Sequence, residues 1–403
     1  MRFGVNYTPS QGWFHSWLDL DRAAVARDFA QIAGLGLDHV RIFPLWPLVQ
    51  PNRTLVRPQA LRDLRDVVDI AGEAGLDVGV DAVQGHLSSF DFLPSWLLTW
   101  HDRNMFTDPD VVGSIADYVR AVSAAVADAP NLLGLTIGNE VNQFAAKPHP
   151  DPHLATPDQV TAWLDVMVAA AREGLDGVAP PAGVTHSMYD ASWYDNRQPF
   201  LPDHAAEIGD LTITHSWVFN GSAQRHGALG SGSVRHAEYL LRLSAAWQRD
   251  PARPLWLQEV GAPTNVVPAQ DGPEFLERTV RHAATVPGLW AITWWCSHDV
   301  SRSLADFPPL EYDLGLFTSE GELKPTGRRL AELVERRDEL VPVADDQPPL
   351  VLDDSDSALY RAQLGPGGSF FEAWNAAAQE RGAGPRIVLQ SRLSDAGQPS
   401  RAR

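Results

Sequence analysis

The sequence predicts an α/β fold, a (β/α)8 TIM barrel with a small C-terminal appendage. The chain has 403 residues, and a barrel of eight units takes ~250 residues, or more with long loops. Short apolar runs rich in β-branched residues alternate with amphipathic segments over residues 1–340. Buried parallel strands have this continuous apolar character. Eight such units in series favour closure into a barrel.

The expected strands and helices alternate along the chain, except that no helix is assigned between the fifth and sixth strands. The eight strands cover Phe3–Asn6, His39–Phe43, Asp77–Ala82, Leu132–Gly138, Gly183–Ser187, Leu211–Ser216, Pro254–Gln258 and Leu289–Trp295. Apolar residues at helical spacing predict helices over Leu20–Ala33, Leu61–Ala74, Pro109–Ala127, Asp158–Glu173, Val234–Gln248, Pro273–Thr285 and Thr326–Arg337. An open doubly wound sheet is the alternative, but no G-x-G-x-x-G or Walker sequence follows the first strand.

The pattern changes after residue 342. Residues 343–349 are acidic and rich in proline, which predicts a linker. Leu350–Leu364 and Phe370–Arg381 are expected to form a small packed appendage. We therefore expect a catalytic barrel over residues 1–342, and a linker with its appendage over residues 343–403.

The composition narrows the possible partners. The formal net charge is −19, from 51 acidic and 32 basic residues, and such a surface repels nucleic acid and anionic membranes. No apolar run reaches the ~18 residues of a membrane span, and the first residues lack the apolar core of a signal peptide. The single cysteine, Cys296, excludes an internal disulfide. We expect a cytoplasmic protein that acts on a small neutral substrate, and the oligomeric state is left open.

Two glutamates follow apolar strands where barrel enzymes build their sites. Glu140 follows the fourth strand, directly after Asn139, and Glu259 follows the seventh. Because active sites of barrel enzymes lie at the carboxyl ends of the strands, these two side chains can face each other across the barrel mouth. Long segments after strands four, six and eight (141–157, 218–233 and 296–324) predict a walled pocket rather than an open cleft.

A pair of carboxyl groups at such a mouth fits hydrolysis of a glycosidic bond with retention. One carboxylic acid protonates the leaving oxygen while the other attacks the anomeric carbon, with the two groups ~5–5.5 Å apart. Like charges so close push the two pKa values apart, which leaves one acid and one nucleophile. This chemistry needs neither a metal nor an organic cofactor, and we expect none.

These motifs resemble the clan A glycoside hydrolases, most closely glycoside hydrolase family 5, over roughly residues 1–340. The resemblance implies that Glu140 is the acid/base and Glu259 the nucleophile. It implies that Arg41, at the end of strand two, keeps the nucleophile ionised and aimed. His86 matches a histidine after strand three, and Asn139 would bind the 2-hydroxyl of the sugar.

Strands six and eight carry the remaining candidates. The family has His-x-Tyr on strand six, where this chain has His215-Ser216-Trp217. The phenol of that tyrosine normally donates a hydrogen bond to the nucleophile, and Tyr189 and Tyr312 are the candidates to replace it. The family also has a tryptophan under the −1 sugar at the end of strand eight. Of Trp294 and Trp295 we favour Trp295, because a polar loop follows it, and Asp299 in that loop is a candidate ligand for sugar hydroxyls.

The substrate follows from the same resemblance. The chain resembles the intracellular exo-β-mannosidases of family 5 that cleave the Man-β-1,4-GlcNAc core of N-glycans, so a small oligosaccharide is the expected partner. An endo-β-mannanase or an endo-β-1,4-glucanase with an open cleft is the alternative within the class. A non-catalytic carbohydrate-binding barrel and a metal-dependent barrel hydrolase are alternatives of other classes.

Overall fold

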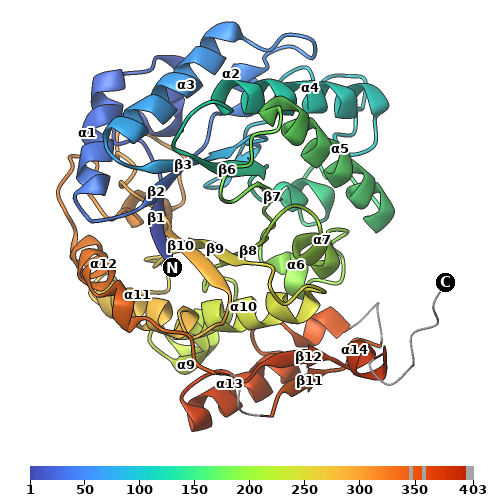
Figure 1. Cartoon of the computed structure of the whole chain (residues 1–403), viewed down its shortest axis with the longest axis vertical. Coiled ribbons are helices and arrows are strands. Elements are labelled where there is room, and N and C mark those ends of the chain that lie inside the picture. The colour runs from blue at the N-terminus through green and yellow to red at the C-terminus, as the bar shows by residue number, and fades with distance from the viewer. Residues whose placement is uncertain (345–347, 356–359, 396–403) are drawn as a thin grey trace.

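The computed structural model describes residues 1–344, 348–355 and 360–395. Eight parallel strands form one sheet in the order β7-β6-β3-β2-β1-β10-β9-β8, and Figure 1 shows them as a ring surrounded by helices. The strands are β1 (Arg2–Asn6), β2 (His39–Ile42), β3 (Asp77–Asp81), β6 (Leu132–Ile137), β7 (Val184–His186), β8 (Thr212–Ser216), β9 (Leu255–Val260) and β10 (Leu289–Trp294). The expected (β/α)8 barrel is confirmed.

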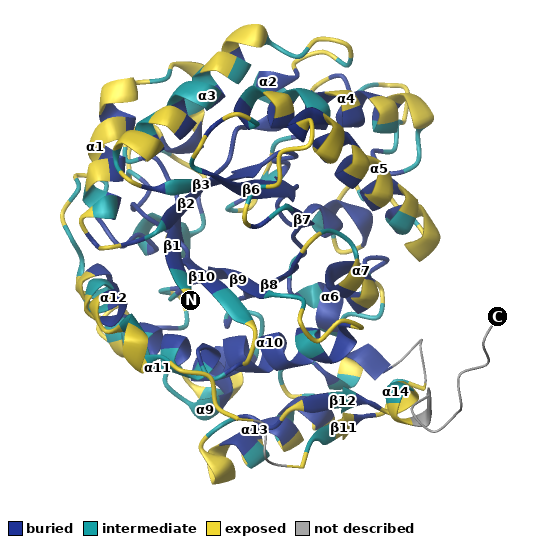
Figure 2. Ribbon diagram, viewed as in Figure 1, coloured by how far each residue is buried: buried dark blue, intermediate teal, exposed yellow. Residues whose placement is uncertain are grey.

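Helices of different lengths connect the strands. The longer ones are α1 (Arg22–Ala33), α3 (Pro58–Glu73), α4 (Pro109–Val126), α5 (Pro157–Leu175), α10 (His236–Trp247), α11 (Gly272–Ala283) and α12 (Pro325–Glu335). The shorter ones are α2 (Trp46–Val49), α6 (Ala191–Tyr194), α7 (Pro202–Glu207), α8 (Ser222–His226) and α9 (Ser231–Val234), with 3-10 turns η1 (Trp13–Leu18), η2 (Val141–Ala145), η3 (Pro309–Asp313) and η4 (Arg337–Glu339). Figure 2 shows buried strands and helices whose outer faces are exposed.

The ends of the sheet, β7 and β8, are joined around Asp210. Its backbone N–H donates to the carbonyl of Val184 at 2.9 Å, and its carboxylate accepts from the N–H of Val184 at 2.7 Å. Gly209 precedes it at φ 77, and a Cβ there would lie 2.7 Å from the same carbonyl. The left-handed conformation and the close approach both require glycine, so a turn closes the barrel at this point.

The strand boundaries agree with the expected ones to within two residues. The largest difference is at β9, which continues to Val260, so Glu259 lies within the strand rather than after it. The short hairpin of β4 (His86–Leu87) and β5 (Phe90–Asp91) and the helices between β7 and β8 were not expected. Elements of two to six residues are too short to show a hydrophobic period.

The interior at the amino ends of the strands contains an apolar cluster. We call this part the floor cluster; its buried residues are Leu133, Ala182, Leu211, Ile213, Trp256 and Ala291. The opposite, carboxyl ends of the strands carry the buried polar and charged residues described below. The two ends of one barrel thus differ in chemistry.

The C-terminal segment packs on the outside of the barrel beside α10 (Figure 1). It contains β11 (Leu350–Leu352), η5 (Tyr360–Gln363), α13 (Ser369–Arg381), β12 (Ile387–Leu389) and α14 (Gln390–Asp395), and β11 pairs in parallel with β12. Phe371 and Trp374 contact the ring of Tyr239 with centroids 4.9 and 5.1 Å apart. The expected linker includes residues 345–347, which lie outside the described residues, and the division at residue 342 stays a prediction. Among the described residues, no helix has the length and apolar character needed to cross a membrane.

Candidate active site

The carboxyl ends of the strands surround a cavity of about 520 Å³. Its lining includes most of the residues expected from the sequence: His86, Asn139, Glu140, Trp217, Glu259 and Trp295. The three long loops each contribute to it, with Gln143 after β6, Phe219 after β8 and Glu311 after β10. Arg41 and His215 are fully buried and contact the glutamates from within the barrel.

Glu140 is fixed where β6 ends. Its backbone has φ 50, a left-handed conformation that residues other than glycine adopt rarely and that concentrates at functional sites. One carboxylate oxygen lies 2.7 Å from Nδ1 of His215, and the other accepts a hydrogen bond of 2.8 Å from the amide of Gln143. Each oxygen of the carboxylate therefore has its own partner.

Glu259 lies opposite His215 in the register of β8 and β9. Its Oε1 accepts a hydrogen bond of 2.6 Å from Arg41, and its Oε2 accepts one of 3.3 Å from the indole of Trp217. A carboxylate oxygen of Glu259 and one of Glu140 lie within 4.8 Å of each other. Retaining glycosidases need a separation of ~5–5.5 Å, and inverting ones need ~6.5–9.5 Å, so this spacing fits retention.

Arg41 joins two buried carboxylates. Its Nη2 donates to Asp81 at 2.9 Å, and its Nη1 donates to Glu259. It also donates to Asn6 at 3.1 Å and to Asn139 at 2.8 Å. Burial lowers the pKa of Arg41, but the charges of Asp81 and Glu259 outweigh burial and raise it above its usual value. The guanidinium is thus a permanent cation beside Glu259.

Trp217 stands where the sequence comparison expected a tyrosine, and its indole contacts Glu259. The Nε1–H group donates to Oε2 of Glu259 at 3.3 Å. The two tyrosines considered from the sequence have other partners. Tyr312 donates its hydroxyl proton to the carbonyl of Leu304 at 2.7 Å, and Tyr189 bonds to the side chain of Asn220. The donor to Glu259 is therefore an indole rather than a phenol.

The two glutamates and His215 titrate as one group. Burial raises the pKa of Glu140, but the hydrogen bond and charge of His215 outweigh it and leave that pKa below its usual value. Burial, joined by the charge of Glu140, leaves the pKa of Glu259 above its usual value, although His215 and Arg41 lower it. Burial lowers the pKa of His215, but the charges of both glutamates raise it above the usual value. A shared proton therefore lies within reach of both carboxylates.

Among the described residues, Glu140, His215 and Glu259 form a group whose ligand atoms lie close enough to share a metal ion. The charge of Arg41, at 2.6 Å from Glu259, repels a divalent cation at this place. His215 already directs Nδ1 at Glu140. The donor set is therefore used within the protein and does not fit a metal ion.

Of the two tryptophans at the end of β10, Trp295 faces the cavity. It lines the cavity and contacts the ring of Trp217 with centroids 6.3 Å apart. Trp294 is buried in the main hydrophobic core, as expected for neighbouring strand residues that point in opposite directions. Trp294 therefore lies outside the cavity lining, whereas Trp295 forms part of it.

His86 and Asp299 have different positions. His86 lines the cavity, and its Nδ1 lies 3.1 Å from Asp91, which His149 also contacts at 3.0 Å. Asp299 lies outside the cavity lining; its carboxylate accepts from the N–H of Gly315 and from Lys324, both at 2.7 Å. The carboxylate of Asp299 thus fixes the loop after β10, and its role in binding sugar hydroxyls stays a prediction.

Several polar residues of the site were missed from the sequence. Asn6 and Asp81 end strands β1 and β3, so a search for polar residues at strand ends would have found them. Gln143 and Glu311 lie in long loops that gave no such signal. Burial raises the pKa of Glu311 to about 7, with the charges of Glu259 and Glu140 adding to it and Ser88 opposing it.

Solved structures of similar proteins identify the family. The chain is 52% identical to GH5_18 from Streptomyces cattleya, with a TM-score of 0.93 and coverage of 98% of this chain and 95% of that one. The chain belongs to GH5_18. GH5_18 from Bifidobacterium longum subsp. longum ATCC 55813 is 45% identical, with a TM-score of 0.93 and coverage of 98% and 92%. Both are glutamate-to-alanine variants in complex with Manβ1-4GlcNAc.

A further GH5_18 structure from S. cattleya, in complex with GlcNAc, is 53% identical, with a TM-score of 0.94 and coverage of 98% and 94%. No family model matches the chain, and no curated protein matches it. Membership of GH5_18, a subfamily of glycoside hydrolase family 5, confirms the expected resemblance and the expected glycosidase.

Proposed function

We propose that the chain is a retaining exo-β-mannosidase that releases mannose from Manβ1-4GlcNAc. The observation that carries the proposal is the presence of this disaccharide in GH5_18 structures 52% and 45% identical to the chain. The cavity of about 520 Å³ falls within the roughly 300–1,000 Å³ of small-molecule sites. A disaccharide is of suitable size for it.

The roles of the two glutamates follow from their partners. Glu259 contacts Arg41 at 2.6 Å, and a guanidinium keeps its charge near neutral pH, so Glu259 is assigned as the nucleophile. Glu140 contacts His215 at 2.7 Å, and an imidazole can exchange a proton, so Glu140 is assigned as the acid/base.

The pKa directions in the free site, with Glu259 raised and Glu140 lowered, favour the opposite roles. In the complex, however, a bound sugar removes water from Glu140. This desolvation raises its pKa, while the contact of Glu259 with Arg41 remains.

The reaction is a double displacement. A carboxylate oxygen of Glu259 attacks the anomeric carbon while the bond to the GlcNAc oxygen breaks, and Glu140 gives its proton to that oxygen. GlcNAc leaves, and a mannosyl ester on Glu259 remains. Glu140 then removes a proton from water, whose oxygen attacks the anomeric carbon and releases mannose. In this cycle Asn139 would bind the 2-hydroxyl, and Trp295 would support the sugar ring.

Exo-action is supported by the loops around the cavity. The segments after β6, β8 and β10 all reach it, through Gln143, Phe219 and Glu311. Walls on these sides favour one short chain end over a polymer that crosses the mouth. An endo-β-mannanase or an endo-β-1,4-glucanase would need an open groove in their place.

A product analysis tests the substrate. We expect equal amounts of mannose and GlcNAc from Manβ1-4GlcNAc, and faster hydrolysis of an aryl β-mannoside than of the β-glucoside, β-galactoside or β-xyloside. The viscosity of a soluble mannan should stay nearly constant. An early fall in viscosity, with di- and trisaccharides as first products, would mean endo-action, and a preference for the glucoside would exclude a mannosidase.

Azide rescue tests the two roles. Glu259→Ala should lower turnover of an aryl β-mannoside by ~10⁴-fold or more, as loss of a nucleophile does in other hydrolases, and azide should then give an α-mannosyl azide. Glu140→Ala should keep more activity on activated aryl glycosides, and azide should give the β-mannosyl azide. Circular dichroism controls for folding. The reverse pattern of azide products would exchange the two roles.

The division into barrel and appendage and the cellular location are also proposals. The parallel pair of β11 and β12, with α13 beside it, supports an appendage over residues 343–403 on a barrel of residues 1–342. The free thiol of Cys296 is compatible with a reducing compartment and so with the cytoplasm. Cell fractionation with an antibody against the protein checks the location.

A further inference from the structure

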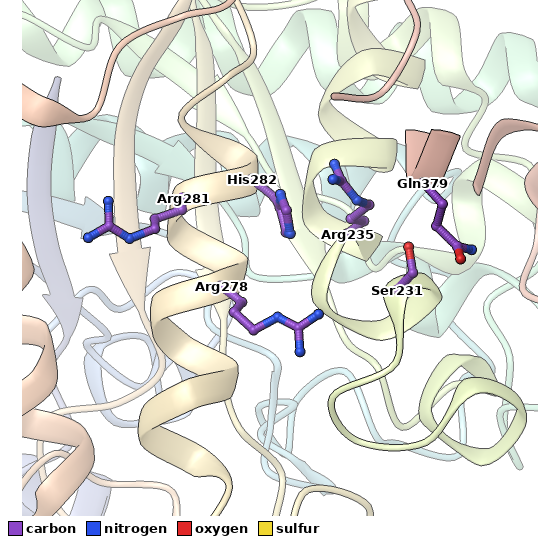
Figure 3. Close-up of a pocket in the computed structure, with 6 residues that line it drawn as sticks. All are labelled: Ser231, Arg235, Arg278, Arg281, His282 and Gln379. Atoms are coloured by element: carbon purple, nitrogen blue, oxygen red, sulfur yellow. The ribbon is translucent and has the colours of Figure 1, made fainter. Parts of the chain in front are cut away.

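A second cavity lies on the outside of the barrel, between α11 and the C-terminal segment. Its volume is about 620 Å³, and its lining residues, shown in Figure 3, are Ser231, Arg235, Arg278, Arg281, His282 and Gln379. They come from α9, the start of α10, α11 and α13. We call it the cationic cavity. None of these residues lines the catalytic cavity.

The cationic cavity concentrates positive charge in an acidic protein. The chain has a net charge of −19, yet the lining residues are three arginines, one histidine, one serine and one glutamine. Burial, together with the charges of Arg235 and Arg278, lowers the pKa of His282 to about 4. The imidazole is therefore neutral at pH 7. An anion between the arginines would relieve the repulsion among their positive charges.

The side chains converge on one space. Figure 3 shows Arg278 and His282 extending from α11 towards the side on which Arg235, Ser231 and Gln379 lie. Arg278 has Glu274 as its carboxylate neighbour, at 3.4 Å and with both side chains partly exposed. An ion pair of this kind is weak, so the guanidinium can bind a ligand.

The other two arginines differ from Arg278. Arg235 donates to Glu238 at 2.6 Å and to the carbonyl of Gly382 at 2.8 Å, so its orientation is fixed. Arg281 points away from the cavity in Figure 3 and pairs with Glu277 at 3.0 Å. The cavity therefore offers one fixed cation and one cation that is weakly engaged.

We propose that the cationic cavity binds a phosphate group. The guanidinium of an arginine matches two oxygens of a phosphate with two parallel N–H groups. The amide of Gln379 and the neutral imidazole of His282 supply further donors, whereas the hydroxyl of Ser231 already donates its proton to Asn375. Since the volume exceeds that of a single ion, the phosphate can be inorganic or part of a small ester such as a sugar phosphate.

Such a ligand would link the C-terminal segment to the barrel. Arg235 already contacts Gly382 at the end of α13, and Ser231 donates to Asn375 of α13 at 2.8 Å. Gln379 lies on the same helix. Because the donors come from both parts, the complete site exists only in the folded chain, and the ligand stabilises that state.

A thermal-shift titration of the full chain tests the proposal. Inorganic phosphate replaces sodium chloride at constant ionic strength, and glucose 6-phosphate is the probe for an ester. The variant is Arg278→Ala. The matched control is Arg120→Ala, which removes a partly exposed arginine that pairs with Glu173 at 2.8 Å on another face.

We expect a saturable rise in Tm for the wild type and Arg120→Ala, and binding of phosphate weaker by ~10-fold or more in Arg278→Ala, since a charge-assisted contact is lost. Tighter binding of glucose 6-phosphate would identify an ester, and equal binding an inorganic ion. Equal responses of Arg278→Ala and wild type, or no saturable response, would overturn the proposal.

A second readout follows His282 itself. Bound phosphate should raise the pKa of His282 from about 4, because an anion favours the imidazolium. The imidazole signal in NMR is assigned by its loss in His282→Gln. Hydrolysis of an aryl β-mannoside without phosphate should be the same in wild type and Arg278→Ala, which shows that the variant folds. A His282 titration unchanged by saturating phosphate would contradict the proposal.

Discussion

Two histidines buried in the same barrel have pKa values shifted in opposite directions. His39, at the start of β2, has the hydroxyl of Thr293 2.8 Å from its Nε2, and burial, with Arg2 adding, lowers its pKa to about 3. His215, near the end of β8, is equally buried, but the charges of Glu259 and Glu140 raise its pKa above the usual value. Burial acts in the same direction on both, so the neighbouring groups determine the difference.

The two ends of the barrel also differ in the groups that surround their buried side chains. At the amino ends, the floor cluster is apolar, and Gly4 leaves room for the ring of His39, since a Cβ there would lie 2.3 Å from it. At the mouth, Arg41, Asp81 and Glu259 are buried and charged. Close packing stabilises the amino ends of the barrel. The paired charges at the mouth carry a desolvation penalty, and they provide the ionisable groups of the proposed reaction. Substitutions at the two ends should therefore have separable effects.

The largest effect is expected for Arg41→Met, at the mouth. The kcat should fall by more than ~100-fold, because Glu259 loses its charge-assisted partner. The free energy of unfolding should fall by about 3–5 kcal/mol, because two buried carboxylates lose their counter-charge. Aryl β-mannoside hydrolysis and urea unfolding measure the two quantities. A normal kcat in the folded fraction would mean that Arg41 only closes the barrel.

Leu133→Ala, in the floor cluster, should affect stability alone. Leu133 is fully buried, and replacing such a leucine by alanine lowers the free energy of unfolding by about 2–5 kcal/mol. We expect the kcat and KM of the folded protein to match the wild type, since none of the cluster residues lines the cavity. A loss of kcat comparable with that of Arg41→Met would show that the two ends are not separable.

A smaller effect is expected for Trp217→Phe, which removes one donor from Glu259. A hydrogen bond to a charged group contributes about 1.5–3 kcal/mol, so kcat should fall by roughly 10-fold or more, with little change in Tm. Trp217→Tyr restores the phenol of the wider family and should keep more activity. Phe219→Leu is the control, because its ring stacks on Trp217 at 5.2 Å but offers no donor. Equal kcat values for Trp217→Phe and wild type would exclude the role.

The features that depend on local sequence pattern could be predicted from the sequence. The eight strands were predictable because buried parallel strands are continuous apolar runs. Glu140 and Glu259 were predictable because each is a charged residue at the carboxyl end of such a run, whereas Arg41 followed from the resemblance to the family. The topology then brings these strand ends to one mouth.

The remaining features depend on contacts between distant segments. Asp299 was expected to bind sugar, and its carboxylate bonds to Lys324, 25 residues further along the chain. The indole of Trp217, which follows β8, bonds to Glu259 on the neighbouring strand β9. The spacing of these residues in the sequence does not indicate this contact. Glu311 lies in a long loop whose path is set by its packing against the barrel, so nothing in the sequence placed it in the cavity.

Glu311 gives the smallest predicted effect and concerns the pH profile. Its carboxyl group has a pKa of about 7, raised by burial and by the charges of Glu259 and Glu140. Coulomb interactions are mutual, so ionised Glu311 raises the pKa of both glutamates. Glu311→Gln removes this charge and keeps the shape of the side chain. The alkaline limb of kcat/KM, which reports the acid form of the free enzyme, should therefore shift to lower pH.

The same substitution should change stability in a defined pH range. A carboxyl group whose pKa is raised on folding binds its proton more tightly in the folded state, so stability falls as pH rises from the ordinary range of a carboxyl group to about 7. Glu311→Gln should flatten this slope in urea unfolding between pH ~4 and ~7. Asp313→Asn is the control, because Asp313 lies in the same 3-10 turn and pairs with exposed Arg302 at 2.8 Å. If both substitutions leave the alkaline limb in place, Glu311 does not act on the two glutamates.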